Sequence, residues 1–447
     1  MSPPIIYYLA IERFRGLENF SWRPARGMNI ILGVDLRLVQ GSALDRLLSD
    51  KALRSRLVTE LAKKDVKDEL TEEAKKVLDT LDETFKNKGL PSGLDIAITG
   101  SQGLSITALI GLTANQQGVQ LPLTSWGAGT RRLSALAISG QKQGEAPITI
   151  VDEIERGLEP YRQRALIETL QAGESQVFLT THSPAAISVG CDAALWYVDA
   201  KGIIGELSAR PIRQYRKSDP EAFLARLTVV AEGATEVGFV TVLLERSLGT
   251  SLEQHGIHIT DAIGNDAALN LLEALSKGGL QFAGFADDEG RYPERWKKVS
   301  EKLGTLLFRW KEGSLEKNVI SLVPDEKLED LIRDPLNEKT GMRLRTLATR
   351  IRSSEKDFEI LKTKAEGKLK QFILEAALGT IPDEKDIDEN EYKADAKIWF
   401  KSTDGGSELA SKVFSLSIWP SLQPQVMPFC NAIRKAVNLP HIENLSP

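Results

Sequence analysis

Hydrophobic positions along the chain alternate between the two-residue period of strands and the three-to-four-residue period of helices. Near the N-terminus, short apolar runs predict strands over 5–9 and 28–33, and 11–17 continues the first of them into a turn. Over 42–88, leucines and valines are spaced three to seven apart among charged residues, which predicts one or two amphipathic surface helices. The chain is therefore expected to begin as β structure that carries a helical insertion.

The rest of the first half alternates strands and helices in the order of a parallel sheet. The predicted strands are 94–99, 104–109 and 147–153, with a further apolar run over 176–181, and the predicted helices are 131–139 and 161–170. Ligand chemistry in such sheets collects at the carboxyl ends of the strands. The acids Asp152 and Glu153 and the histidine His182 stand at those ends.

A second α/β unit is predicted to start near Leu227, after a polar, basic segment at 211–220 that is the best candidate for a linker. A strand from Leu227 leads into a helix that ends near 245, and another strand covers 280–286. From about residue 328 onward the apolar spacing is mostly helical, and a final apolar helix lies near 429–437.

The composition limits the class of protein. A length of 447 residues predicts two or three domains, and the 42% of hydrophobic residues excludes disordered and fibrous classes. The two cysteines, Cys191 and Cys430, are far apart, which excludes a disulfide framework and a cysteine-based zinc site. No stretch of about 18 apolar residues occurs, so we expect a cytoplasmic protein with no membrane partner.

The net charge is mildly negative, with 57 Lys and Arg against 62 Asp and Glu. Nucleic-acid binding would therefore depend on local basic patches or on metal ions. Two stretches are candidates for contacts to DNA phosphates, although each is also typical of an ordinary solvated face: Arg291, Arg295, Lys297, Lys298 and Lys302 in one, and Arg343, Arg345, Arg350 and Arg352 in the other. Trp296 and Trp310 are expected to be core residues.

Asp152 and Glu153 have the form of a Walker B element, in which the first acid acts on Mg²⁺ and the second polarises the attacking water. Paired acids at a strand end are common, so the pair alone is a weak signal. Here the helix start at 125–130 precedes it, with free N–H groups that can contact a phosphate, and His182 follows it. The order of the three elements favours a nucleotide-related role over a structural one.

A second set of acids follows the strands of the second unit. Glu232 and Glu236 are one helical turn apart, and Asp287, Asp288 and Glu289 follow the next predicted strand. Such a set of hard oxygen ligands suits Mg²⁺ or Mn²⁺, and two such ions promote phosphodiester cleavage. The alternative, solvated acids at strand ends, fits either group taken singly better than both together.

The first half resembles the ABC-type ATPase head of the recombination and SMC-like group. The resemblance rests on a signature motif at 125–129, Walker B at 148–153, a D-loop at 157–160 and a switch histidine at His182. It implies nucleotide contacts by Ser125, Gly127, Gly129, Asp152, Glu153 and His182. A P-loop, G-x-x-x-x-G-K-[ST], is absent from the whole chain, so ATP hydrolysis is the weaker expectation.

An ATPase head followed by these acids resembles the overcoming-lysogenization-defect (OLD) nuclease family, in its class 2 branch. The sequence segments that carry the resemblance are 232–239, 284–289, 406–414 and Trp419-Pro420. It implies a Toprim domain whose two-metal site nicks and cleaves DNA. The implied metal ligands are Glu232, Glu236, Asp261, Asp287, Asp288 and Glu289, with Asp287 and Glu289 favoured for the D-x-D roles. Lys412 is the implied basic residue near the scissile phosphate, which completes the catalytic set Glu232, Glu236, Asp287, Glu289 and Lys412.

We therefore expect an α/β protein with an incomplete ABC-ATPase-like head at 1–210, a Toprim domain at 227–325 and a mostly helical C-terminal domain at 326–447. The expected function is a Mg²⁺- or Mn²⁺-dependent DNA endonuclease with a regulatory or assembly head, in phage defence or DNA repair. The missing P-loop region reflects either natural loss or an internally deleted or rearranged chain.

Two other classes of function remain open. One is a non-catalytic DNA-binding or assembly subunit in which both sites are degenerate. The other is a different Toprim activity, such as a topoisomerase or primase, for which the chain has no additional domain. The resemblance also implies a homodimer and a superfamily-one helicase as a partner.

Overall fold

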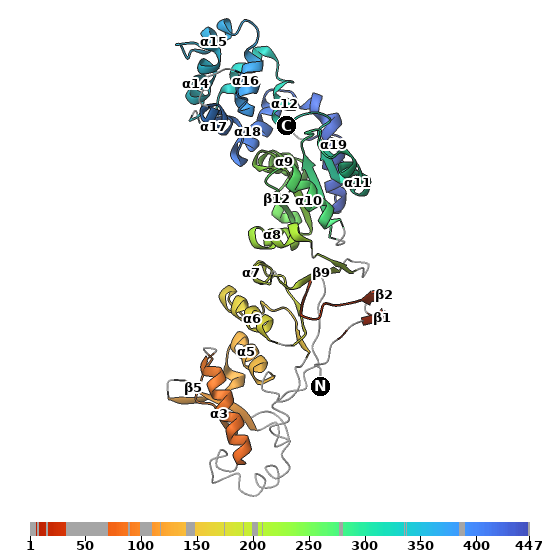
Figure 1. Ribbon diagram of the computed structural model, residues 1–447, viewed down its shortest axis with the longest axis vertical. Coiled ribbons are helices and arrows are strands. Elements are labelled where there is room, and N and C mark those ends of the chain that lie inside the picture. The colour runs from red at the N-terminus through yellow and green to blue at the C-terminus, as the bar shows by residue number, and fades with distance from the viewer. Residues whose placement is uncertain are drawn as a thin grey trace. The chain divides into compact units, whose positions relative to one another are not determined.

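The computed structural model describes most of the second half of the chain and separate parts of the first. The described residues are 6, 9–14, 17–32, 70–87, 90–98, 110–116, 118–139, 148–173, 175–190, 192–198, 204–207, 209–276, 280–334, 336, 338–383 and 389–445. They form two compact units, with the boundary at residue 202 (Figure 1).

The first unit is built on a five-stranded sheet in the order β10-β9-β3-β8-β7. Its strands are β3 (Met28–Leu32), β7 (Thr149–Val151), β8 (Val177–Thr180), β9 (Ala194–Val198) and, just past the boundary, β10 (Ile204–Glu206). β3 is parallel to both of its neighbours, and β7 is parallel to β8. The parallel sheet expected for this region is therefore confirmed, and Trp22, Phe178 and Trp196 pack edge to face in its core.

The remaining elements of the first unit are a hairpin, a three-stranded antiparallel sheet and helices. They are β1 (Leu9–Phe14), β2 (Leu17–Trp22), α3 (Glu72–Asn87), β4 (Asp95–Ile98), β5 (Ile110–Gln116), β6 (Val119–Pro122), α5 (Ala128–Ser139), α6 (Pro160–Ala172) and α7 (Pro184–Val189). Leu78, Leu81 and Phe85 of α3 are buried, as its amphipathic pattern predicts. Most of the predicted strand 5–9, the strand 104–109 and the first part of the helical stretch 42–88 lie outside the described residues.

The second unit contains a parallel sheet in the order β12-β11-β13-β14. Its strands and connecting helices are β11 (Leu227–Ala231), α9 (Ala234–Leu248), β12 (Ile257–Asp261), α10 (Asn265–Leu275), β13 (Phe282–Ala286), α11 (Pro293–Leu303) and β14 (Leu307–Arg309). Every residue of β11 and β13 is buried, which is typical of central parallel strands covered on both faces. Trp296 and Trp310 are also buried, so their prediction as core residues is confirmed.

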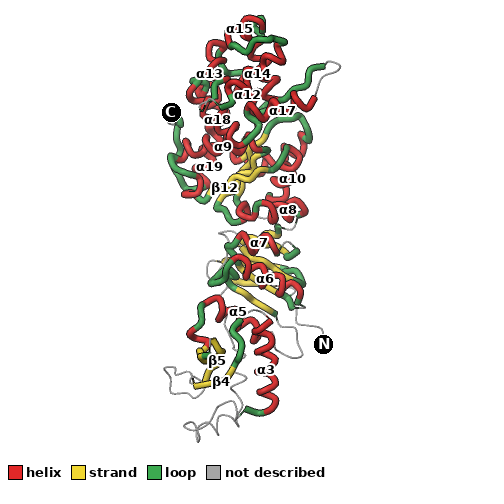
Figure 2. The backbone as a smooth tube through the Cα atoms, turned by 90° about the vertical axis from the view of Figure 1, so that its left-hand side faces the viewer, coloured by secondary structure: helices red, strands yellow, loops and turns green. Residues whose placement is uncertain are grey.

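The rest of the chain is helical, as predicted. The helices are α12 (Leu315–Ile320), α13 (Leu328–Ile332), α14 (Thr340–Ile351), α15 (Phe358–Lys364), α16 (Leu369–Leu378), α17 (Glu389–Trp399), α18 (Thr403–Ser415) and α19 (Trp419–Ala436). Figure 2 shows α18 between the group of α13, α14 and α15 and helix α9, and Figure 1 likewise shows it between α14 and α9.

These C-terminal helices share one hydrophobic core with the sheet. Phe285 of β13 stacks on Phe308 of β14 with ring centroids 4.6 Å apart, and Phe429 of α19 lies 5.8 Å from Phe285. The core continues from Leu227 to Leu445. The boundaries 1–210, 227–325 and 326–447 stay predictions, since the structure divides the chain only near residue 202.

The segment predicted as a linker, 211–220, is not a linker. Helix α8 (Arg210–Ser218) occupies most of it and buries Ile212, Tyr215 and Arg216. The Tyr215 hydroxyl donates to the carbonyl of Ala262 at 2.8 Å. The prediction was wrong because the exposed basic residues dominate the composition and conceal a short apolar face.

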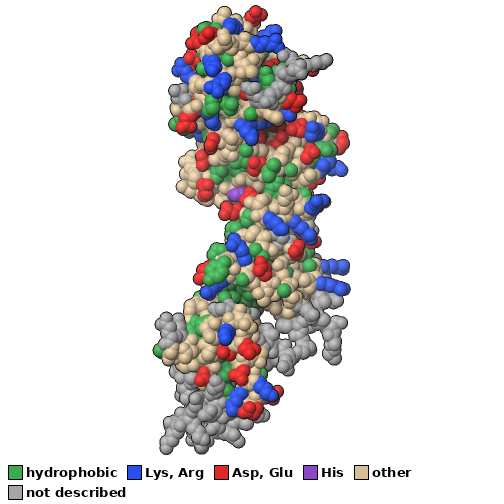
Figure 3. All heavy atoms as spheres, turned by 60° about the vertical axis from the view of Figure 1, so that its left-hand side comes forward, with side chains coloured by type: hydrophobic (Ala, Val, Ile, Leu, Met, Phe, Trp, Pro, Cys, Tyr) green, Lys and Arg blue, Asp and Glu red, His purple; other side chains and the backbone are tan. Residues whose placement is uncertain are grey.

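None of the helices in the described part of the chain combines the length and the apolar composition needed to cross a bilayer. On the face that Figure 3 shows, acidic and basic side chains are intermixed over both units.

Candidate active site

Two of the predicted acids meet at the carboxyl ends of neighbouring strands. β11 and β13 pair in parallel, so Glu232 and Asp287 emerge side by side. Glu232 Oε2 accepts hydrogen bonds from the Asp287 backbone N–H at 2.8 Å and from Asn265 Nδ2 at 2.7 Å. Asn265 Nδ2 also donates to the Asp287 carbonyl at 3.2 Å. The amide of Asn265 thus ties the two strand ends together and fixes the direction of the Glu232 carboxylate.

Glu236, one turn into α9, is buried together with these acids. Burial, followed by the charges of Glu316 and Glu232, raises its pKa to about 8. Burial also raises the pKa of Asp287 to about 9, with further contributions from Glu236, Glu232 and Glu316. The pKa of Glu232 is raised as well, chiefly by burial. Several carboxyls that disfavour one another's ionisation need a cation nearby before they can all be charged.

Glu316, in the first turn of α12, is a member of the group that was not predicted. Its side chain is 1% exposed, and neither carboxylate oxygen has a hydrogen-bond partner within the described part of the chain. A buried carboxylate that accepts no hydrogen bond is costly, by several kcal/mol for an ion that loses its hydration. The donor set and this unsatisfied carboxylate fit a divalent cation with oxygen ligands.

A signal for Glu316 was present in the sequence. β14 is the parallel neighbour of β13 and ends at the same edge of the sheet. Glu316 therefore follows a parallel strand as Glu232 and Asp287 do, although it lies farther along the chain, in the first turn of the next helix. The strand was missed because it has only three residues.

Lys401 is the second residue that was not predicted. Its ammonium lies 3.9 Å from Glu316 Oε1, in the segment between α17 and α18. Burial lowers the pKa of Lys401, but the charges of Glu316, Glu236, Asp287 and Glu232 raise it, and the net shift is upward. Lys401 therefore brings a permanent positive charge to the carboxylates.

The other acids after β13 lie at the edge of the group. Asp288 Oδ1 is 2.6 Å from Arg309 Nη2 and accepts from the Gly290 N–H at 2.8 Å. Glu289 is exposed, with its carboxylate 3.7 Å from Arg291, and its charge raises the pKa of Glu232. Glu289 is thus within electrostatic reach of the buried acids, whereas Asp288 is engaged by an arginine.

Asp261, at the end of β12, takes part in its own turn. Its Oδ1 accepts from the Ile263 N–H at 2.7 Å. The same turn continues to Gly264, whose N–H donates to the Glu232 carbonyl at 2.7 Å. Asp261 therefore shapes the loop beside Glu232 in this structure.

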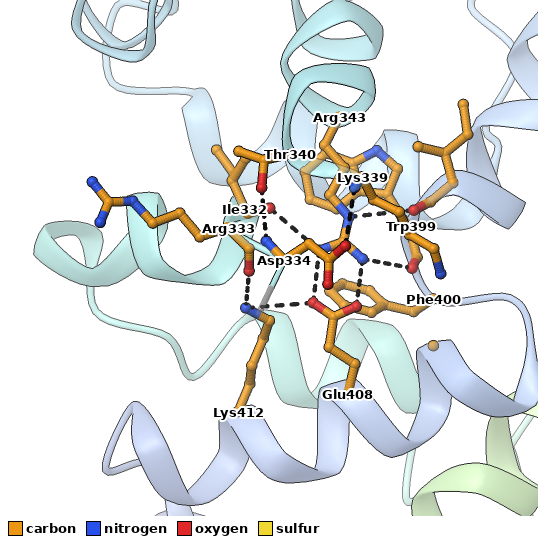
Figure 4. A network of polar contacts seen from close by, with 12 residues as sticks. Ile332, Arg333, Asp334, Lys339, Thr340, Arg343, Trp399, Phe400, Glu408 and Lys412 are labelled. Atoms are coloured by element: carbon orange, nitrogen blue, oxygen red, sulfur yellow. Dashed lines mark hydrogen bonds and ion pairs between the residues drawn. The ribbon is translucent and has the colours of Figure 1, made fainter. Parts of the chain in front are cut away.

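Lys412 lies in a different place from the one the resemblance implied. It is 6% exposed, and its ammonium donates to the carbonyls of Asp330 at 2.7 Å and Arg333 at 2.5 Å. It also lies 3.5 Å from Glu408, in a buried network (Figure 4). The partners of Lys412 thus do not include Glu232, Glu236, Asp287 or Glu316. The lysine beside those acids is Lys401.

The acids named above lie close together, but their side chains are not arranged as a complete metal-coordination site. Among the described residues, no group of three or more His, Cys, Asp or Glu side chains has the arrangement that holds a metal ion. The group is instead a set of buried, mutually repelling carboxyls at one edge of a sheet.

Two arginines predicted to contact DNA phosphates are unsuited to that role. The side chains of Arg343 and Arg350 are 0% and 2% exposed, and they pair with Glu408 and Asp395. The prediction is wrong for these two because their guanidinium groups face inward from α14. In the other stretch Arg295 pairs with Glu273 at 2.7 Å, and the remaining basic residues, Arg291, Lys297, Lys298 and Lys302, are exposed.

The predicted Walker B acids follow β7 in the first unit. Asp152 Oδ1 accepts from the Thr180 hydroxyl at 2.7 Å, and the same hydroxyl accepts from the Glu153 N–H at 2.8 Å. His182, at the end of β8, donates its backbone N–H to Glu155 Oε1 at 2.7 Å. The structure therefore places these three residues at adjacent strand ends, as predicted.

The predicted signature motif opens α5. Ser125 and Gly127 are exposed, and Arg132 of this helix donates to the carbonyls of Asp152 and Glu153. A Cβ added to Gly129 would lie 1.8 Å from the Gly157 carbonyl oxygen, so only glycine fits there. The signature and D-loop segments are therefore in direct contact. The stretch after β3, where a P-loop would stand, lies outside the described residues.

Two protein families match separate parts of the chain. Residues 15–188 match the family described as "AAA domain, putative AbiEii toxin, Type IV TA system". Residues 223–288 match the family described as "Overcoming lysogenization defect protein-like, TOPRIM domain". Toprim domains in general bind divalent metal ions. The expected order of an ATPase-like domain, a Toprim domain and a helical C-terminal region is confirmed.

Similar solved structures include C-terminal regions of two OLD proteins. That of Burkholderia pseudomallei is 16% identical, with 34% of this chain and 88% of that chain covered and a TM-score of 0.20. That of Xanthomonas campestris pv. campestris is 16% identical, with 42% and 98% covered and a TM-score of 0.22. Among curated proteins, no sequence matches at a significant level. At these TM-scores the likenesses add nothing to the assignment, which rests on the two family matches.

Proposed function

We propose that this chain, which has the domain architecture of the OLD family, is a divalent-metal-dependent DNA endonuclease whose site lies at the ends of β11 and β13. The observation that carries the proposal is a group of buried acids: Glu232, Glu236 and Asp287, whose pKa values are raised, and Glu316, whose carboxylate oxygens accept no hydrogen bond within the described part of the chain. A group of this kind is costly unless cations join it.

These four acids would hold the metal ions, with Glu289 at the rim. Mg²⁺ and Mn²⁺ both prefer such oxygen ligands, and two such ions when bound supply an activated water and offset the charge that develops in phosphodiester cleavage. Asn265 keeps the Glu232 carboxylate aimed at the site through its hydrogen bond. Asp261 and Asp288, which have other partners in this structure, are secondary candidates for ligands.

Lys401 is proposed to act on the DNA phosphate. Its ammonium remains protonated because the surrounding carboxylates raise its pKa. A positive charge held at the point where negative charge develops stabilises the transition state. We therefore assign to Lys401 the role that the family resemblance suggested for Lys412.

The ATPase-like head is proposed to serve as a regulatory or assembly platform in the cytoplasm, in phage defence or DNA repair. Asp152, Glu153 and His182 lie at adjacent strand ends, which supports a nucleotide-related role, but the chain contains no P-loop motif. Nucleotide binding is therefore the weaker part of this proposal. A homodimer and a superfamily-one helicase partner are extensions of the same proposal.

The first test measures conversion of supercoiled plasmid to nicked and linear forms with Mg²⁺ or Mn²⁺. Glu232→Gln keeps the size of the side chain and removes its charge, and it should lower cleavage by at least about 100-fold, since loss of a group that only supports a metal ligand already costs about 10- to 100-fold. Glu301→Gln, an exposed change on α11, is the matched control and should cleave like the wild type.

If Glu232→Gln cleaved plasmid like the wild type, the acids at the ends of β11 and β13 would not be the cleavage site. DNA binding by the wild type without cleavage under either metal would instead favour the non-catalytic binding subunit. Relaxed plasmid without nicks would point to a topoisomerase.

A further inference from the structure

Arg343 of α14 is completely buried and donates to groups from three parts of the second unit. Its two terminal nitrogens bind the two carboxylate oxygens of Glu408 on α18, at 2.7 and 2.6 Å. The guanidinium also donates to the carbonyls of Ile332 at 3.2 Å, Ile398 at 3.3 Å and Trp399 at 3.0 Å. Figure 4 shows Glu408 and Lys412 reaching from one face of α18 toward this arginine.

Two of these carbonyls belong to the segment that leads into Lys401. Within it, the ring of Phe400 lies 5.0 Å from the Arg343 guanidinium carbon, and Trp399 Nε1 donates to the Thr346 hydroxyl at 2.9 Å. All of these contacts fix the segment to α14.

The other side of the same segment is fixed to α9, the helix that carries Glu236. The hydroxyl of Thr235, the neighbour of Glu236, donates to the Phe400 carbonyl at 3.2 Å. Immediately after Lys401, Ser402 caps α18 by accepting from the Gly405 N–H at 3.1 Å. The backbone of Lys401 is therefore held between the helix that carries Glu236 and the one that carries Arg343.

We propose that Arg343 and Glu408 are positioning residues of the cleavage site, which hold the Lys401 ammonium at the buried acids. A two-pronged guanidinium–carboxylate pair sets direction as well as distance, which an apolar contact at the same place would not do. Lys412 supports the pair, since its ammonium lies 3.5 Å from Glu408 Oε1. This inference rests on the proposed function.

The chain offers a matched control on the same helix. Arg350, also on α14, is buried and binds Asp395 Oδ2 at 2.9 Å. Its other hydrogen bonds go to the carbonyls of Thr380 at 2.9 Å and Tyr392 at 3.5 Å. This pair resembles the Arg343–Glu408 pair in chemistry and burial, but it holds the middle of α17, at Tyr392 and Asp395, instead of the carbonyls of Ile398 and Trp399 next to Lys401.

The experiment compares Glu408→Gln with Asp395→Asn in the full chain, with enzyme in excess over plasmid and with saturating Mn²⁺. Both changes remove one buried charge with almost no change in size, so both should lower the melting temperature. Glu408→Gln should slow single-turnover nicking by about 10- to 100-fold, the order expected when a reacting group loses its alignment. Asp395→Asn should nick at the wild-type rate.

Coupling to Lys401 separates positioning from general support. Lys401→Met removes the group that is being positioned, so Glu408→Gln should have no further effect on the nicking rate in a Lys401→Met background. If Glu408→Gln cannot be purified, Arg343→Lys, which keeps the charge and loses the fork, replaces it in the same cycle.

Additive effects of Lys401→Met and Glu408→Gln would overturn the positioning role, as would an equal loss of rate in Asp395→Asn. Absence of cleavage by the wild type would overturn the proposed function and this inference with it. If the wild type is active and the effects of Lys401→Met and Glu408→Gln are additive, only the positioning role is overturned, and the proposed function stands.

Discussion

The buried carboxyls should make the stability of the protein depend on pH in an unusual direction. The pKa values of Glu236, about 8, and Asp287, about 9, lie above those of free side chains, so the folded state binds these protons more tightly than the unfolded state. Their contribution to stability is therefore complete below about pH 4 and is lost as the pH rises toward 9.

Glu316→Gln tests this prediction. It removes a charge that raises both pKa values, so the difference in melting temperature between variant and wild type should become more positive from pH 5 to pH 9 without metal. Thermal unfolding at fixed ionic strength measures the difference, with Glu301→Gln as the exposed control. A difference that does not change with pH would mean that Glu316 does not contribute to these shifts. Adding Mn²⁺ should narrow the difference, because a cation offsets the same repulsion.

At the residue scale the sequence identified the acids that follow long strands and missed the ones that follow short elements. Glu232, Glu236 and Asp287 were predicted, since a buried strand before an acid is visible in the pattern, and the structure brings them together. Lys401 had no such signal, because it lies in a short connection and reaches the acids only through the packing of α18. Arg343 was predicted as a surface residue, since sequence alone does not show which face of α14 turns inward.

The crossing of helices α9 and α18 holds both sides of the site at the scale of elements. A Cβ at Gly406 would lie 2.0 Å from the Thr235 carbonyl oxygen, and one at Gly238 would lie 1.9 Å from that of Thr403. Thr235 adjoins Glu236, and Thr403 is two residues from Lys401. The close approach that the glycines permit therefore sets the separation of acid and lysine.

Gly406→Ala should push the helices apart. We expect a loss of stability of at least about 1–3 kcal/mol, the usual cost of overpacking, together with slower nicking. Gly341→Ala on α14 is the control: a Cβ there meets nothing within 4 Å, and it should stabilise the protein by about 0.4–1 kcal/mol. Urea unfolding measures the stability of both variants, and plasmid nicking measures their activity. If Gly406→Ala were as stable as the wild type, the two helices could move apart without loss of stability, which would contradict this prediction.

Element prediction succeeded where periodicity was strong and failed where composition opposed it. The runs that became β3, β11 and β13 are apolar at nearly every position and were predicted as strands. Helix α8 was not predicted, because its buried face consists of three residues among many polar ones. Hydrophobic periodicity is informative only when several turns of it are present.

At the scale of the whole molecule, every residue assigned to cleavage belongs to the second unit. Its hydrophobic core extends from Leu227 to Leu445 and includes both the sheet and the C-terminal helices. A unit with its own core is expected to fold by itself. A fragment of residues 209–447, which starts just before α8, should therefore melt cooperatively and should keep metal-dependent nicking within about tenfold of the full chain.

The same comparison reveals what the head contributes. Without a P-loop lysine, the first unit lacks the charge that holds the β- and γ-phosphates, so ATP should leave the nicking rate of both the full chain and the fragment unchanged. Glu232→Gln in the fragment controls for contaminating nucleases. A folded but inactive fragment would show that the head supplies part of the cleavage machinery. If ATP stimulated nicking by the full chain but not by the fragment, Asp152, Glu153 and His182 would still form a working nucleotide site. The nicking rate would then depend on the first unit, although the cleavage residues lie in the second.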